Sequence, residues 1–102
     1  MTNKNKVGVL GGGSWATAII KMLSENLNNI NWWIKNKNSV SYIKQHQYNP
    51  KYLAKTKLNL EKLNITSDIN DVVSKSDILI LAVPSVYLAE TIDSISLDIK
   101  NK

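Results

Sequence analysis

The sequence predicts an α/β fold in which a parallel sheet carries helices on both of its faces. Two observations predict it. Short apolar runs alternate with segments whose apolar residues recur at helical spacing, in the order strand, helix, strand, helix, up to a fourth pair. The first apolar run also ends in three consecutive glycines that lead directly into a helical segment. Such alternation favours parallel strands joined by right-handed crossovers, and we expect the strand order 3-2-1-4.

The glycine turn follows the first predicted strand. Gly11, Gly12 and Gly13 carry no Cβ, so the turn can take positive φ and a ligand phosphate can approach the main chain closely. A helix that begins near Ser14 turns its free N–H groups and its positive dipole end toward the same space. Gly11-x-Gly13-x-x-Ala16 fits the dinucleotide-binding fingerprint, in which Ala16 is the small residue that lets the helix pack on the strand. For this motif alone, a simple glycine hinge is the alternative.

The first half of the chain supplies two strands and the helix between them. Residues 7–10 form the first strand, and the helix after the glycines ends at Asn28-Asn29. Residues 30–34 form the second strand, whose two tryptophans we expect to pack in the core. The apolar stripe of the helix comprises Ala16, Ile19, Ile20, Leu23 and Leu27.

The residues after the second strand bear on coenzyme preference. About 20 residues past the glycines, an NAD-binding domain has an acidic residue that accepts hydrogen bonds from the adenosine ribose. Lys35 and Asn36 stand there instead. A cation at this position attracts a ribose 2′-phosphate, which favours NADP over NAD. The alternative is that Lys35 is simply one lysine of a lysine-rich chain.

The second half of the chain repeats the alternation. A weaker helix is predicted over residues 39–47, with Ser39 as its cap, and Pro50 closes that segment. A short strand at Ile65-Thr66 precedes a short helix capped by Asp68. One side of the first of these helices carries Val40, Ile43 and Gln47, and the buried side of the second carries Ile69, Val72 and Val73. A buried strand is predicted over 78–83. The last predicted helix covers 86–95, with the apolar stripe Leu88, Ile92 and Ile95.

The predicted topology brings two distant segments together. In the order 3-2-1-4, the first and fourth strands flank the point where the strand order reverses. Ligands bind beyond the carboxyl ends of such strands, so residues 11–15 and Val83-Pro84-Ser85 should converge on one crevice. The fold expected for residues 1–102 is therefore a partial Rossmann-type doubly wound sheet, the amino-terminal part of a dinucleotide-binding domain.

Composition argues against several other functions. The net charge is +5, but the lysines are scattered and arginine is absent, whereas nucleic-acid-binding modules cluster their cations and use arginine to read bases. With no cysteine and His46 as the single histidine, we expect neither disulfides nor a metal site. No apolar run approaches the roughly 18 residues of a membrane span, and the polar residues 1–6 do not resemble a signal peptide. The sequence therefore predicts a cytoplasmic protein that binds no nucleic acid.

The sequence resembles the amino-terminal cofactor-binding domain of bacterial-type glycerol-3-phosphate dehydrogenase, which uses NAD(P). The resemblance covers nearly all of the chain, in order and spacing. Gly-x-Gly-Ser-Trp-x-Thr-Ala is more specific than a bare glycine fingerprint, because tryptophan is an unusual residue at the start of a phosphate-binding helix. The segments that carry the resemblance are Gly11 to Ala18, Trp33, Asn49-Pro50-Lys51-Tyr52-Leu53, Thr66-Ser67-Asp68-Ile69 and Ala82-Val83-Pro84-Ser85.

The resemblance implies roles for individual residues. Ser14 and Trp15 would contact the cofactor at the helix start, Lys35 and Asn36 would meet the adenosine ribose or its phosphate, and Tyr52 would be a further pocket residue. The family commonly has arginine or histidine at the two-residue position, so a lysine there keeps the charge but loses the bidentate fork. NADP or NAD is the expected cofactor, with NADPH favoured. The expected cofactor-binding residues are Gly11, Gly12, Gly13, Ser14, Trp15, Ala16, Trp33, Lys35, Asn36, Tyr52, Val83 and Pro84.

The reaction implied by the resemblance is hydride transfer between the nicotinamide and the pair dihydroxyacetone phosphate and sn-glycerol 3-phosphate, in phospholipid precursor synthesis. The essential lysines of the family, one of them in a helical catalytic domain, are expected beyond Lys102. No catalytic residue is therefore expected here, the chain alone should be inactive, and the full-length protein could be an oligomer. The alternatives are another Rossmann dehydrogenase, against which the Ser14-Trp15 pair speaks, and a stand-alone NAD(P)-binding sensor module.

Overall fold

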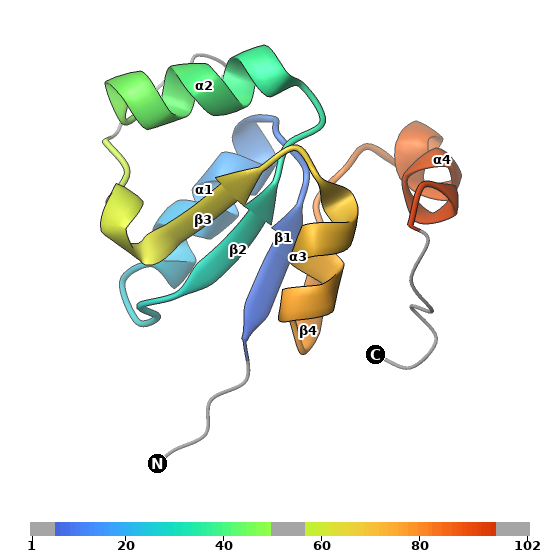
Figure 1. Cartoon of the computed structure of the whole chain (residues 1–102), viewed down its shortest axis with the longest axis horizontal. Coiled ribbons are helices and arrows are strands. Elements are labelled where there is room, and N and C mark those ends of the chain that lie inside the picture. Colours follow the sequence, from blue (N-terminus) through green and yellow to red (C-terminus); the bar gives the residue numbers. More distant parts are fainter. Residues whose placement is uncertain (1–5, 50–56, 96–102) are drawn as a thin grey trace.

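The computed structural model describes residues 6–49 and 57–95. Its centre is a parallel sheet of four strands in the order β3-β2-β1-β4 (Figure 1). The predicted strand order and parallel pairing are therefore confirmed. The strands are β1 (Val7–Leu10), β2 (Ile30–Trp33), β3 (Leu63–Thr66) and β4 (Ile78–Leu81).

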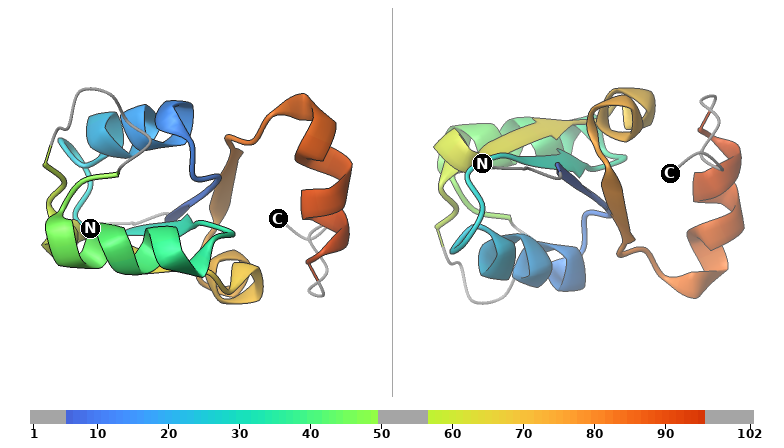
Figure 2. Two further views of the ribbon diagram at one scale, coloured as in Figure 1. Left: turned by 90° about the horizontal axis from the view of Figure 1, so that it is seen from above. Right: turned by 90° about the horizontal axis from the view of Figure 1, so that it is seen from below.

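Helices cover both faces of this sheet. Figure 2 shows α1 and α3 on opposite sides of the strands, with α4 beyond β4. The helices are α1 (Ser14–Leu23), α2 (Lys37–His46), α3 (Ile69–Lys75) and α4 (Leu88–Asp93), and two short 3₁₀ helices are η1 (Leu60–Lys62) and η2 (Ser85–Tyr87).

The core lies in two layers, because successive side chains of a strand point to opposite faces of the sheet. Val9 and Trp32 pack in the larger layer with residues of α1 and α2. Leu10 and Trp33, their neighbours in sequence, pack in the smaller layer with α3. The two adjacent tryptophans thus serve different sides of the sheet. Among the described residues, no helix is long and apolar enough to cross a membrane.

The predicted boundaries of the first two helices are wrong. The first helix ends at Leu23 rather than at Asn28-Asn29. A turn follows it, in which the Leu27 N–H donates to the Leu23 carbonyl at 2.9 Å. Ser39 does not cap the second helix. Asn36 caps it, because the Asn36 side chain accepts hydrogen bonds from the backbone N–H groups of residues 38 and 39. Gln47 is exposed and ends that helix in a left-handed conformation, with φ 69°.

The fourth strand is also less buried than predicted. Its apolar sequence is typical of a central strand, yet Ile78 and Leu81 are exposed. β4 pairs with β1, and no other described strand pairs with it. The helix after it follows a 3₁₀ turn, and its most buried residue is Thr91 rather than a member of the predicted apolar stripe. α4 therefore buries a polar side chain and none of the predicted apolar stripe.

Candidate functional site

The turn from β1 to α1 begins with a backbone conformation that requires glycine. Gly11 has φ 143°, and a Cβ there would lie 2.2 Å from the carbonyl oxygen of Ala82. The Ala82 N–H donates to the Leu10 carbonyl at 2.8 Å. This hydrogen bond holds the Ala82 backbone, and with it the Ala82 carbonyl oxygen, against the turn. The end of β1 and the segment after β4 thus meet with no space for a side chain between them.

The end of the turn is open. Gly13 is the N-cap of α1 at φ −86°, ψ −169°, an extended conformation that any residue can adopt. A Cβ at this position would have no heavy atom within 4 Å. As Gly13 has no side chain to cap α1, the first N–H groups of the helix face this open space. An N-terminus of this kind is a ready anion-binding site.

Two buried side chains hold the turn from behind. The Trp32 indole Nε1 donates to the Gly11 carbonyl at 2.7 Å, and the Asn49 Nδ2 donates to the Gly12 carbonyl at 3.0 Å. Both side chains are fully buried. Asn49 also donates to the Thr17 hydroxyl at 2.6 Å, which links the turn to the first full turn of α1. The Gly11 and Gly12 carbonyls thus each accept a hydrogen bond from a buried side chain of the protein.

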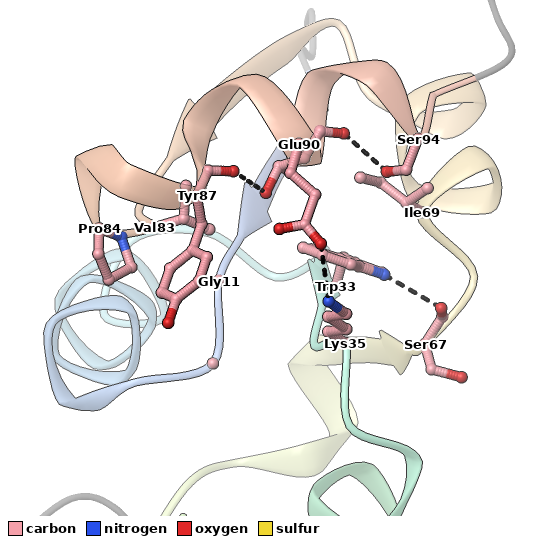
Figure 3. A pocket seen from close by; sticks show the side chains of 12 residues that line it. Gly11, Trp33, Lys35, Ser67, Ile69, Val83, Pro84, Tyr87, Glu90 and Ser94 are labelled. Carbon is pink, nitrogen blue, oxygen red and sulfur yellow. Dashed lines mark hydrogen bonds and ion pairs between the residues drawn. The ribbon is translucent and has the colours of Figure 1, made fainter.

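A cavity of about 550 Å³ opens at the carboxyl ends of β1, β2 and β4 (Figure 3). This volume is within the range of small-molecule sites. Of the residues expected to bind a cofactor, six line it: Gly11, Gly12, Trp33, Lys35, Val83 and Pro84. The predicted convergence of the glycine turn with the segment after the fourth strand is therefore present in the structure.

Five of the expected residues lie elsewhere in the structure. Gly13, Ser14 and Trp15 are exposed at the start of α1, outside the cavity wall, and Trp15 is 64% exposed. Ala16 is fully buried beside the glycine turn, as its role in helix packing predicts. The Asn36 side chain is engaged as the cap of α2. Tyr52, the remaining one, lies outside the described residues.

Several cavity residues were not among the cofactor-binding residues expected from the sequence. They come from the loop after β3, from η2 and from α4, and they are Ser67, Ile69, Tyr87, Glu90, Thr91 and Ser94. The Ser67 carbonyl accepts a hydrogen bond from the Trp33 indole at 3.0 Å. Glu90 forms an ion pair with Lys35 at 3.3 Å. The apolar spacing of residues 86–95 predicted a helix but no binding residue.

Comparisons with known proteins identify the family of this architecture. A family model described as the N-terminus of NAD-dependent glycerol-3-phosphate dehydrogenase matches residues 6–102. The glycerol-3-phosphate dehydrogenase (NAD(P)+) of Macrococcus caseolyticus is 37% identical over 91 residues, which cover 89% of this chain and 27% of that protein. The enzyme of the same name from Teredinibacter turnerae is 39% identical over 90 residues, 88% of this chain and 26% of that protein.

A solved structure agrees with these matches. The crystal structure of glycerol-3-phosphate dehydrogenase from Coxiella burnetii superposes with a TM-score of 0.78 at 25% sequence identity, over 87% of this chain and 27% of that one. The chain thus spans about a quarter of the length of the curated relatives it matches. It belongs to the NAD-dependent glycerol-3-phosphate dehydrogenase family and has the fold of the NAD-binding amino-terminal domain of that family.

Proposed function

We propose that this chain binds the dinucleotide cofactor of an NAD(P)-dependent glycerol-3-phosphate dehydrogenase, with the pyrophosphate at the N-terminus of α1. The observation that carries the proposal is the glycine turn, which is tightly held at Gly11 and open at Gly13. Backbone N–H groups at this opening and the dipole of a ten-residue helix favour a negatively charged group. The cavity at the switch point between β1 and β4 then receives the rest of the cofactor.

The remaining expected residues take roles around this centre. Ser14 and Trp15 are exposed beside the open turn, where they can contact the pyrophosphate side of the cofactor. Trp33 and Val83 provide apolar walls of the cavity. Lys35 lies at the end of β2, where the adenosine ribose binds in domains of this fold. Tyr52 keeps the role that the family resemblance implies for it.

The whole reaction is part of the proposal as well. We propose that the cofactor held here exchanges a hydride with dihydroxyacetone phosphate or sn-glycerol 3-phosphate. The nicotinamide supplies that chemistry when bound, and this chain binds and orients it. We assign no catalytic role to any described residue. The family match supports this assignment over another Rossmann dehydrogenase.

A pair of substitutions at Gly13 tests the anion site. We expect Gly13→Asp to weaken the binding of NADPH and NADH by about tenfold more than Gly13→Asn does. Both side chains suit the N-cap conformation of this residue and are equal in size, but only aspartate adds a negative charge at the opening. Dissociation constants from quenching of tryptophan fluorescence measure the difference. Urea unfolding of the two variants serves as the control, and equal affinities of both variants for each dinucleotide would contradict the proposed pyrophosphate position.

The contribution of Lys35 to coenzyme preference is tested separately. We propose that its ammonium group favours NADPH over NADH by attracting the 2′-phosphate. Lys35→Glu should then weaken NADPH binding by about tenfold or more while changing NADH binding much less. Lys44→Glu, at an exposed position near the far end of α2, makes the same charge change as a control. Tighter binding of NADH than of NADPH by the unsubstituted chain would contradict this proposal.

A further inference from the structure

The two walls of the cavity are joined by a pair of opposite charges. Lys35 follows β2, whereas Glu90 is on α4, and their Nζ and Oε2 atoms are 3.3 Å apart. Figure 3 shows the Glu90 side chain pointing toward Lys35 in front of Trp33. Among the described residues that line the cavity, Lys35 is the only basic and Glu90 the only acidic one. The charge that Lys35 brings to the cavity is therefore balanced within the cavity itself.

This balance changes what Lys35 can offer to a ligand. A 2′-phosphate that approaches the ammonium group also meets the Glu90 carboxylate, because the two side chains are in contact. A phosphate dianion is repelled by the carboxylate as it is attracted by the ammonium group. A ribose 2′-hydroxyl is a donor, and a carboxylate is its preferred acceptor. Lys35 thus presents a group suited to a ribose with a 2′-phosphate, and Glu90 presents a group suited to a ribose with a free 2′-hydroxyl.

We propose that Glu90 is a specificity-determining residue that limits the preference for NADPH. The acidic group that is missing after β2 is supplied across the cavity from α4, where it opposes the 2′-phosphate and can accept a hydrogen bond from the 2′-hydroxyl. This inference rests on the proposed dinucleotide-binding function. It adds a residue far along the chain, after the fourth strand, to the determinants of coenzyme choice.

The test compares Glu90→Gln with the unsubstituted chain at low ionic strength. We expect the NADPH dissociation constant to fall by about fivefold and the NADH constant to stay the same or rise. Glu25→Gln removes the same charge at an exposed position after α1 and is the matched control. The fragments 2′,5′-ADP and 5′-AMP should repeat the pattern, since they differ only in the ribose phosphate. Raising the salt concentration should shrink the effect, because exposed charges are screened.

The outcomes separate the two proposals. If neither dinucleotide binds the unsubstituted chain, the proposed function fails, and this inference with it. If both bind and Glu90→Gln shifts the ratio of their dissociation constants no more than Glu25→Gln does, the role of Glu90 alone is overturned.

The side chains of the ion pair are 76% and 63% exposed, and such pairs contribute little to stability. Equal thermal unfolding of the variant and the unsubstituted chain would confirm that the shift in ratio does not come from misfolding.

Discussion

Gly11→Ala is expected to lower the free energy of unfolding by about 3 kcal/mol or more, whereas Gly13→Ala should change it by less than about 1 kcal/mol. The first substitution places a Cβ 2.2 Å from the Ala82 carbonyl oxygen, on a residue at φ 143°. That oxygen belongs to backbone that is hydrogen bonded to the end of β1, so the chain cannot move aside at low cost. The second substitution adds a methyl group to open space at a φ that alanine readily adopts.

Urea unfolding followed by circular dichroism measures both changes. Small domains have about 5–15 kcal/mol of stability in total, so the Gly11 variant should be largely unfolded at denaturant concentrations that leave the Gly13 variant native. The Gly13 variant is the matched control, because it makes the same chemical change two residues away in the same turn. Similar stabilities for the two variants would contradict the division of this turn into a tightly held glycine and an open one.

The sequence predicts most of the fold, because its signals are local. The apolar run at Val7–Leu10 is a strand, the helix starts at Ser14, and Asp68 caps the helix that starts at Ile69. The errors arise where a local signal leaves a choice. Serine and asparagine are both good cap residues, and the structure has Asn36 rather than Ser39 at this position. The apolar sequence of 78–83 indicates a strand, but apolar character alone does not show how much of that strand other described residues cover, and Ile78 and Leu81 are exposed.

The candidate site could be predicted in part, including Trp33 at the end of the second strand and Lys35 after it. Glycine spacing and strand order place Gly11, Val83 and Pro84 at one crevice, and the structure brings them to one cavity. The pairing of Glu90 with Lys35 depends on where α4 lies relative to the sheet, which no periodicity encodes. The hydrogen bond from Asn49 to the Gly12 carbonyl likewise joins residues 37 positions apart. Contacts of this kind follow from the tertiary arrangement rather than from any short motif.

Trp32→Ala is expected to lower the free energy of unfolding by about 3–5 kcal/mol. The indole is fully buried in the larger core layer, so its removal leaves a cavity among residues of β1, α1 and α2. It also leaves the Gly11 carbonyl without its 2.7 Å hydrogen bond. Trp15→Ala is the matched control, because that indole is 64% exposed, and its loss should cost less than about 0.5 kcal/mol.

Trp32→Phe separates the two contributions. Phenylalanine keeps most of the apolar contact but cannot donate, so the Gly11 carbonyl stays buried and unpaired at an expected cost of about 1–3 kcal/mol. Because the same carbonyl belongs to the glycine turn, this variant should also bind NADPH and NADH more weakly under conditions in which it remains folded. Trp15→Phe is a control for stability alone, because the Trp15 indole is 64% exposed and its replacement should leave the free energy of unfolding nearly unchanged. Unchanged affinity in folded Trp32→Phe would show that the indole supports the core and not the geometry of the turn.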